Sequence, residues 1–367
     1  MSPMPDLPQR ISLAGQMADI FCRGIEQGLW GERLPGERVL CEKYQVSRNT
    51  LRTALAQLHR EKLVKPVHGS GNRILGLPGK QACRLQSHDV GLLSPVPLER
   101  LRPTQTLWID ELRGMLSERG CRLHVFHGEQ YFRSNPGPAL QRLIASNPHG
   151  CWLLTLSSEA MQRWFAKNDV KCVVAGSVHA GLDLPYCDLD QRATCRHAAG
   201  VLLGLGHRRL ALVISRSQLA GDLESEAGFI EGIQQSSRTG AEARIAYHDG
   251  SVSGISHALR RLRGQHPPVT ALLVANAYHY LAVVSRLAHT GCRVPADVSV
   301  ISRDDDLFLS YLTPPPARYT AAPRVMARSL LRAILDSLTS ESTVHKGQRL
   351  MPEFLAGETI ARATGVS

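Results

Sequence analysis

Residues 34–75 read LPGERVLCEKYQVSRNTLRTALAQLHREKLVKPVHGSGNRIL, and this stretch decides the fold of the N-terminal part of the chain. Leu34-Pro35-Gly36 forms a turn that can open a short helix. Ser47 then stands where the hydroxyl of an N-cap accepts an orphan amide hydrogen bond. The residues after it repeat at the spacing of one buried helix face, at Leu51, Ala54, Leu55 and Leu58. The pattern predicts two helices separated by a tight turn.

The N-terminal end of the second predicted helix is basic. Arg48 and Arg52 lie four residues apart and share one side of the helix, with Asn49 close by. In a helix-turn-helix, this end of the helix meets base edges in the major groove. Taken singly these side chains are ordinary solvated charges, but residues 38–73 hold eight Lys or Arg against two Glu. Such a concentration indicates phosphate binding.

Two short strands are predicted after this helix, at Val64–Val67 and Arg73–Leu75. They flank the segment from His68 to Asn72, whose glycines allow positive φ or a close backbone approach. Upstream, an apolar stripe is predicted to pack in the core against the second helix rather than to bind a ligand; it consists of Leu13, Met17, Ile20, Phe21 and Ile25. The whole segment is therefore predicted to be a winged helix-turn-helix, an α+β fold.

Residues 10–75 resemble the DNA-binding domain of the GntR family of bacterial transcription regulators. The resemblance rests on Leu34-Pro35-Gly36-Glu37-Arg38, on VSRNTLRTALAQL at 46–58, and on His68-Gly69-Ser70-Gly71. It implies contacts to bases or phosphates in the major groove and an approach of the wing to the minor groove. The residues to which it assigns these contacts are Arg38, Ser47, Arg48, Asn49, Thr50, Arg52, His68 and Gly69.

Length and composition predict a further, larger part. The chain has 367 residues, 43% of them hydrophobic, and a net charge of +11, of which residues 1–80 carry +5. The absence of an apolar run of about eighteen residues and of a signal segment predicts a cytoplasmic protein that does not enter a membrane. The nine cysteines include no C-x-x-C pair, so we expect neither a disulfide framework nor a metal site. No cofactor is expected.

The domain organisation follows from patterning. We expect a DNA-binding domain at 1–75, a linker at 76–88 and a second domain at 89–367. Probable strands alternate with helical patterns at 90–94, 122–126, 151–155, 171–175, 210–214, 244–248, 270–274 and 298–301. This alternation predicts parallel sheets covered on both faces. The length favours two α/β lobes, with a ligand bound beyond the carboxyl ends of the strands.

Polar residues that directly follow those strands are candidates for the cleft between the lobes. Hydroxyls, an amide and carboxylates suit a small polar ligand, although Ser and Asn are also common turn formers and N-caps. The candidates are Ser94, Thr155, Ser157, Ser177, Ser215, Ser217, Asn276, Arg303 and Asp304 to Asp306.

Residues 88–362 resemble the effector domain of the LacI/GalR family, which shares the two-lobed fold of periplasmic sugar-binding proteins. The resemblance rests on LGHRRLA at 205–211, TALLVAN at 270–276, and VPADVSVI at 294–301 followed by Asp304-Asp305. It implies a periplasmic-binding-protein-like type I fold that binds a small polar, possibly sugar-related effector. Ser94, Ser215, Asn276 and Asp304 are the residues we predict to touch this ligand.

The second half departs from that family at three places. Ser225 stands where the family has an arginine that grips the ligand, Ala277 replaces an aspartate, and Ile301-Ser302-Arg303 replaces the usual approach to Asp304. Two alternatives follow: an atypical ligand, or a domain that only dimerises.

Enzymatic function is the other alternative. Three adjacent aspartates, Asp304 to Asp306, rarely converge on one metal ion or reaction centre. An aminotransferase-like domain would need a Schiff-base lysine, and Lys167, Lys171 and Lys346 sit in no matching motif. The sequence therefore predicts a dimeric regulator, most simply a repressor, that binds a near-palindromic DNA operator and is not an enzyme.

Overall fold

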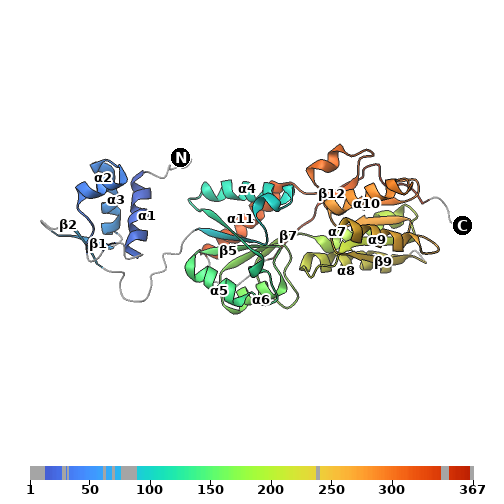
Figure 1. Cartoon of the computed structure of the whole chain (residues 1–367), viewed down its shortest axis with the longest axis horizontal. Helices are drawn as coiled ribbons and strands as arrows, with labels where there is room; N and C mark the ends of the chain where they lie inside the picture. Colours follow the sequence, from blue (N-terminus) through green and yellow to red (C-terminus); the bar gives the residue numbers. More distant parts are fainter. Residues whose placement is uncertain are drawn as a thin grey trace, which may run out of the picture. The chain divides into compact units, whose positions relative to one another are not determined.

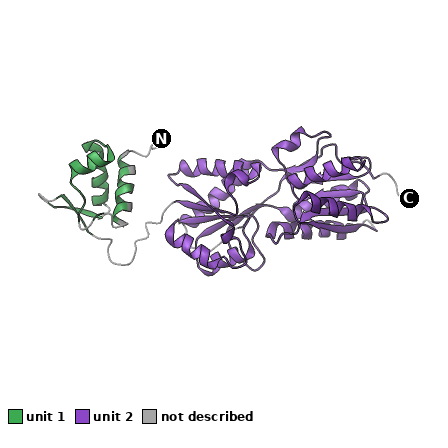
Figure 2. Cartoon of the chain, viewed as in Figure 1, with its two compact units in different colours: residues 1–86 green, residues 87–367 purple. Residues whose placement is uncertain are grey.

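The computed structural model describes residues 13–26, 30, 33–60, 63–67, 71–75, 89–236, 240–339 and 347–363. The chain divides into two compact units, residues 1–86 and 87–367 (Figure 2). Within the described ranges, no helix is both long and apolar enough to cross a lipid bilayer.

The first unit is a three-helix domain with a β-hairpin (Figure 1). Its elements are α1 (Leu13–Glu26), α2 (Glu37–Tyr44), α3 (Arg48–Arg60), β1 (Val64–Val67) and β2 (Gly71–Ile74), and the two strands pair antiparallel. The predicted winged helix-turn-helix is confirmed.

The core of this unit is the apolar face of α3. Leu51, Ala54, Leu55 and Leu58 are all buried, and Met17 and Phe21 of α1 join them in one cluster. Ile20 and Ile25 pack against its edge, whereas the side chain of Leu13 lies outside the described residues. The predicted stripe on α1 is thus core, which leaves the opposite side of α3 free for another use.

The second unit consists of two lobes, each with a six-stranded sheet between helices. The sheet of lobe 1 is parallel throughout, in the order β13-β7-β6-β5-β3-β4. One core cluster joins α4 and α11 to one face of this sheet, and another joins α5 and α6 to the opposite face. The elements are β3 (Val90–Ser94), η1 (Leu98–Arg100), α4 (Pro103–Ser117), β4 (Leu123–His127), η2 (Glu129–Tyr131), α5 (Gly137–Ser146), β5 (Cys151–Thr155), α6 (Glu159–Lys167), β6 (Cys172–Ala175), β7 (Tyr186–Leu189), α11 (Pro323–Thr339) and β13 (Gln348–Leu350).

The sheet of lobe 2 has the order β14-β12-β11-β10-β8-β9, and only β14 runs antiparallel to its neighbour. Helices α9 and α10 pack on one face and α7 and α8 on the other. The elements are α7 (Gln191–Gly204), β8 (Arg209–Ser215), α8 (Ala220–Gln234), β9 (Glu242–His248), α9 (Val252–Arg263), β10 (Ala271–Val274), α10 (Ala277–His289), β11 (Ser299–Ser302), η3 (Leu307–Tyr311), β12 (Ala317–Thr320) and β14 (Glu353–Leu355).

All eight strands predicted for this unit are present, each within two residues of the expected bounds. Four further strands were not predicted: β7, β12, β13 and β14. They have only three or four residues and mix charged or polar side chains with apolar ones, so they lack the continuous apolar run of the central strands. These strands adjoin the places where the chain crosses between the lobes, near residues 190, 321 and 351.

Candidate functional site

Helix α3 begins with a side-chain cap. The hydroxyl of Ser47 accepts a hydrogen bond from the Thr50 amide (3.2 Å) and shares another with the Thr50 hydroxyl (2.8 Å). The predicted N-cap is therefore confirmed. It places Arg48 and Asn49, both exposed, in the first turn of the helix.

The three predicted DNA-contacting arginines differ in their surroundings. Arg52 pairs with Glu37 (Nε to Oε2, 3.1 Å), and Arg38 approaches Glu42 (3.8 Å). Both pairs are solvent-exposed, and such pairs contribute little to stability, so either arginine can leave its partner for another anion. No carboxylate partner is found for Arg48 in the described part of the chain. Arg48 is therefore the most available of the three for an external anion or base.

The hairpin is anchored to the helices. The Leu34 amide donates to the Asn72 carbonyl (3.0 Å), and His59 of α3 hydrogen-bonds the Asn72 side chain (2.7 Å). Gly71, the first residue of β2, has a φ of +78°, which favours glycine next to the tip of the hairpin. The predicted contacts His68 and Gly69 lie outside the described residues. The wing strands are thus fixed relative to the exposed end of α3.

The second candidate site is a cavity of about 470 Å³ between the two lobes. It lies beyond the carboxyl ends of the strands, as predicted for this class of fold. Six of the predicted cleft residues line it: Ser157, Ser177, Ser215, Ser217, Asn276 and Arg303. Its volume suits a small-molecule ligand.

Other predicted cleft residues have different positions. The hydroxyl of Ser94 is buried and donates to the Val96 carbonyl (2.6 Å), and that of Thr155 donates to the Leu93 carbonyl (2.7 Å). Asp304 is not among the lining residues, nor are the two aspartates that follow it. The side chain of Asn276 caps α10 through its oxygen, which leaves its amide nitrogen as the group for a ligand.

A chain of charged groups joins the two lobes beside this cavity. Asp304 pairs with Arg102 of lobe 1 (2.5 Å) and with Arg303 of its own lobe (3.0 Å). Arg303 also pairs with Asp222 (3.1 Å), whose other oxygen accepts from Ser217 (2.5 Å). Burial raises the pKa of Asp304, but Arg303 and Arg102 outweigh it and bring that pKa down to about 2. Both charges of the central pair therefore persist at neutral pH.

The departures at positions 225 and 277 have structural explanations. The guanidinium of Arg303 donates to the buried Ser225 hydroxyl (2.7 Å), so an arginine from the end of β11 fills the space beside this serine. Ala277, the first residue of α10, is fully buried in the core of lobe 2. The cleft thus keeps a guanidinium, which comes from the end of β11 instead of from α8.

Two carboxyl groups, Asp188 and Asp222, and two histidines, His248 and His279, lie in the cleft region and were missed at the sequence level. Asp188, on an unpredicted strand, receives a hydrogen bond from Ser177 (2.6 Å), and burial raises its pKa to about 6. His279 lines the cavity, and its ring packs edge-on against His248 at 4.6 Å. Burial, with His248 and Arg102 nearby, lowers the pKa of His279 to about 4. Spacing along the chain carries no signal for these groups, because each comes from a different element.

The histidine pair has unused hydrogen-bonding capacity. The Gly250 amide donates to Nδ1 of His248 (3.0 Å), so the neutral ring carries its proton on Nε2. Within the described residues, neither this Nε2 nor Nδ1 of His279 has a hydrogen-bond partner, although both are buried. Such atoms suit a ligand hydroxyl or a bound water.

Acidification should destabilise the second unit through His279. Its pKa in the folded state is about 4, below the usual 6.5. Between these values the unfolded chain binds more protons, so the free energy of unfolding falls as the pH drops, by at most about 1.4 kcal/mol per pH unit for one group. Asp188 has the opposite effect, because its pKa is raised in the folded state. Between pH 6 and 3.8 the folded chain binds more protons at this group, so the free energy of unfolding rises as the pH drops. Urea unfolding at several pH values should give a flatter pH dependence for His279→Gln than for the parent protein. Equal slopes would contradict this assignment.

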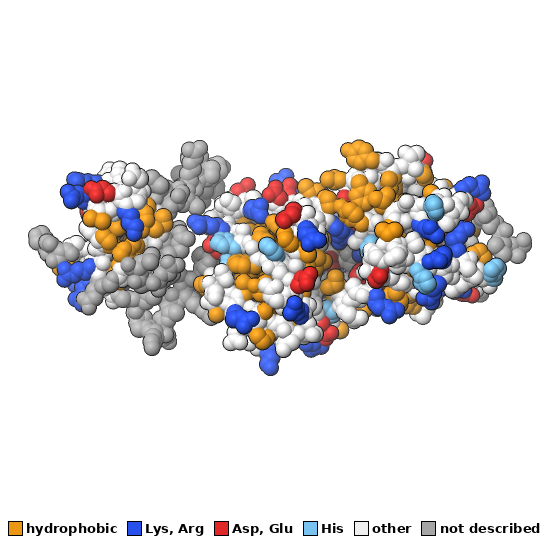
Figure 3. Space-filling model, viewed as in Figure 1, with side chains coloured by type: hydrophobic (Ala, Val, Ile, Leu, Met, Phe, Trp, Pro, Cys, Tyr) orange, Lys and Arg blue, Asp and Glu red, His pale blue; other side chains and the backbone are white. Residues whose placement is uncertain are grey.

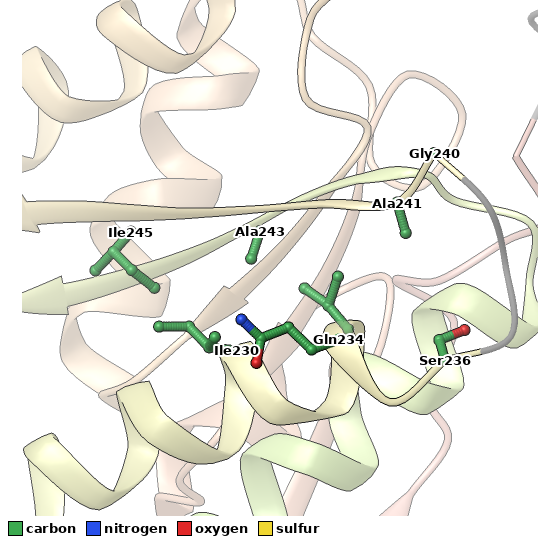
Figure 4. A pocket seen from close by; sticks show the side chains of 8 residues that line it. Ile230, Gln234, Ser236, Gly240, Ala241, Ala243 and Ile245 are labelled. Carbon is green, nitrogen blue, oxygen red and sulfur yellow. The ribbon is translucent and has the colours of Figure 1, made fainter.

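A second hollow lies along edge strand β9, beside the C-terminal part of α8 (Figure 4). Aliphatic side chains such as Ile230 and Ile245 dominate its lining, with Gln234 and Ser236 as the only polar side chains. It offers few groups that could recognise a polar ligand. In the described ranges, no cluster of His, Cys, Asp and Glu is arranged to hold a metal ion.

Comparison with known proteins finds family similarity in both parts of the chain. Residues 25–74 match the sequence model of the "Bacterial regulatory proteins, gntR family", and residues 199–360 match a "Periplasmic binding protein-like domain". Both resemblances found in the sequence are thereby confirmed.

Individual relatives agree with these matches. The chain is 28% identical over 158 residues to the HTH-type transcriptional regulator CelR of Thermobifida fusca, covering 43% of this chain and 46% of that protein. The chain spans about half the length of the curated relatives that it matches. A CelR–cellobiose complex has the same fold (TM-score 0.66, 22% identity, 86% of this chain and 92% of that one). So does a LacI family transcriptional regulator from Bifidobacterium animalis subsp. lactis (TM-score 0.65, 22% identity, 76% of this chain and 100% of that one).

Proposed function

Because the chain joins a GntR-type DNA-binding domain to a periplasmic-binding-protein-like domain, we propose that it is a transcription regulator, acting as a repressor on a specific DNA operator. The observation that carries this proposal is the exposed first turn of α3, where Arg48 and Asn49 stand beside Arg52. A guanidinium and an amide at this position can read guanine and adenine edges in the major groove. Arg38, Ser47 and Thr50 supply backbone contacts, and His68 and Gly69 extend them to the minor groove.

The effector is proposed to be a small, neutral, hydroxyl-rich molecule. The cleft offers serine hydroxyls, the amides of Asn276 and Gln105, and the unpartnered Nδ1 of His279, while Arg102 and Arg303 are paired with Asp304 and Asp222. CelR, a relative of this chain, is known in complex with cellobiose. Ligand binding would change lobe closure and thereby the relative placement of two DNA readers.

A homodimer fits the exposed apolar side chains of lobe 2. Tyr311 and Leu307 of η3 are 86% and 62% exposed, and Tyr278 and Leu281 of α10 are also exposed. Figure 3 shows hydrophobic side chains gathered on this upper part of the second unit. By contrast, α11 buries its apolar face in the core of lobe 1. Two readers in one dimer suit a near-palindromic operator. A non-enzymatic, cytoplasmic role accords with this function.

DNA binding by the full chain should weaken steeply with salt. If three Lys or Arg side chains of the first unit each neutralise one phosphate, the logarithmic slope is about 2.7 per protomer, roughly a forty-fold loss between 50 and 200 mM salt. Fluorescence anisotropy with a labelled duplex measures this salt dependence directly. A flat response would exclude the basic side chains of the first unit from phosphate binding.

A ligand-independent DNA-binding protein, whose second unit only dimerises, is the alternative. Thermal unfolding of the full chain with a panel of mono- and disaccharides, cellobiose included, separates the two. We expect at least one sugar to raise the Tm of the parent protein. Gln105→Ala alters only the cavity wall, so it should abolish that rise without lowering the Tm of the ligand-free protein. No shift with any sugar would favour the alternative.

A further inference from the structure

Lobe 2 contains a segment rich in positive charge. Residues 252–296, which include α9 and α10, contain five arginines and four histidines but no Asp or Glu. Over α9, Figure 3 shows a group of Lys and Arg side chains. A solvated helical surface ordinarily mixes both signs of charge, so this composition calls for an explanation.

Three of these arginines border one groove. It has a volume of about 290 Å³ and lies between the C-terminal ends of α9 and α10. Arg260 and Arg263 lie three residues apart on α9, Arg286 faces them from α10, and Thr290 completes the polar rim. Leu259 and Leu287 form the floor. In the described part of the chain, none of the three guanidiniums has a carboxylate partner or a side-chain hydrogen bond.

An acidic side chain beside the groove does not neutralise these arginines. Asp297 borders an adjoining hollow together with Arg263. Both of its oxygens are taken by Arg293, at 2.8 and 3.2 Å. Hydrogen bonds from Arg293 are the main reason that the pKa of Asp297 falls to about 2, with Arg263 a minor cause. The groove therefore keeps three cations around one concave surface.

The helix dipole accounts for only part of this arrangement. Cations are favoured near helix C-termini, and all three arginines lie in the last turns of their helices. However, the Thr290 hydroxyl already donates to the Arg286 and Leu287 carbonyls, and the Gly264 amide donates to the Arg260 carbonyl. Dipole compensation does not explain why the cations converge without any carboxylate, since like charges at such spacing repel.

We propose that the groove bordered by Arg260, Arg263 and Arg286 binds a phosphate group. Guanidinium forks match phosphate oxygens in pairs, and three of them suit a multiply charged anion better than a single carboxylate. The volume fits the phosphate end of a small phosphorylated molecule, and the same chemistry could be presented by a nucleic-acid backbone. Because α10 begins at the cleft and runs away from it, the groove lies toward the amino ends of the parallel strands of lobe 2, opposite the cleft. It is a second site, independent of the effector cleft.

The test compares two charge-matched variants of the full chain. The groove variant is R260Q/R263Q/R286Q. The control variant is R133Q/R142Q/R332Q, which removes three exposed arginines from lobe 1. Circular dichroism and thermal unfolding check that both remain folded. Calorimetric titration with pyrophosphate at constant ionic strength, and anisotropy with a random-sequence DNA duplex, distinguish the two sources of phosphate.

We expect pyrophosphate to bind saturably at one site per chain. Its affinity should fall at least tenfold in the groove variant and stay unchanged in the control variant. A second outcome is that pyrophosphate binding does not reach saturation while the groove variant loses more duplex affinity than the control variant. In that case the groove is still a phosphate site, and its phosphate comes from nucleic acid. Equal behaviour of the two variants in both arms would overturn the proposal. So would polyglutamate binding as tightly as pyrophosphate, because the groove would then be a carboxylate site.

Discussion

Replacing Arg48 by alanine is expected to weaken operator binding more than any other single change in the first unit. One bidentate contact to a base contributes about 1–3 kcal/mol, and a dimer on two half-sites loses it twice, about 2–6 kcal/mol in all. The side chain is exposed in the first turn of α3 and has no carboxylate partner in the described residues, so nothing within this unit needs rearranging for it to reach DNA. The preference for the contacted base should relax as well.

Arg60→Ala provides the matched control, because Arg60 is exposed at the opposite end of the same helix. It removes the same charge without touching the first turn. Competition titrations against operator variants with single base changes measure both affinity and preference. Equal effects of the two substitutions would reduce Arg48 to a general electrostatic contribution and contradict its role in base readout.

In the second unit, Asp304→Ala is expected to lower the free energy of unfolding by about 3 kcal/mol, the lower end of the loss for breaking a buried ion pair. Arg303 is only 8% exposed and would keep Asp222 and Ser225 as partners, which limits the loss. Arg102 would also lose its partner, but its side chain is 30% exposed and water can replace the carboxylate.

Two further variants make this prediction specific. Arg102→Ala should cost about 1 kcal/mol or less, because it breaks only the partly exposed pair between the lobes. Glu159→Ala, which removes an exposed pair with Arg163, should cost less than either. Urea unfolding followed by circular dichroism ranks the three. If Asp304→Ala costs no more than Glu159→Ala, the charged chain beside the cavity does not stabilise this unit.

The local features of the first unit were predictable from sequence because each depends on neighbours in the chain. The cap at Ser47 requires only an amide three residues later, and the buried face of α3 follows from helical periodicity. Central strands such as β5 and β10 were found for the same reason, since they are continuous apolar runs.

The effector cleft was only partly predictable, because its chemistry depends on contacts between distant segments. Arg102 and Asp304 are two hundred and two positions apart, and nothing in either segment indicates the pairing. Asp188 lies on a four-residue strand without an apolar run. The serine at position 225 looked like the loss of an arginine, whereas the three-dimensional structure brings Arg303 to its side. Comparison of a single sequence segment with a family motif therefore cannot show that a side chain from another segment replaces the missing one.

The central claim is that α3 and the wing read a defined DNA sequence. Selection from a library of random duplexes by the full chain, followed by sequencing of the bound fraction, tests it most directly. The account predicts enrichment of one near-palindromic motif, and loss of that enrichment in R48A/R52A. Bound DNA with no enriched motif, or the same motif selected by R48A/R52A, would contradict it.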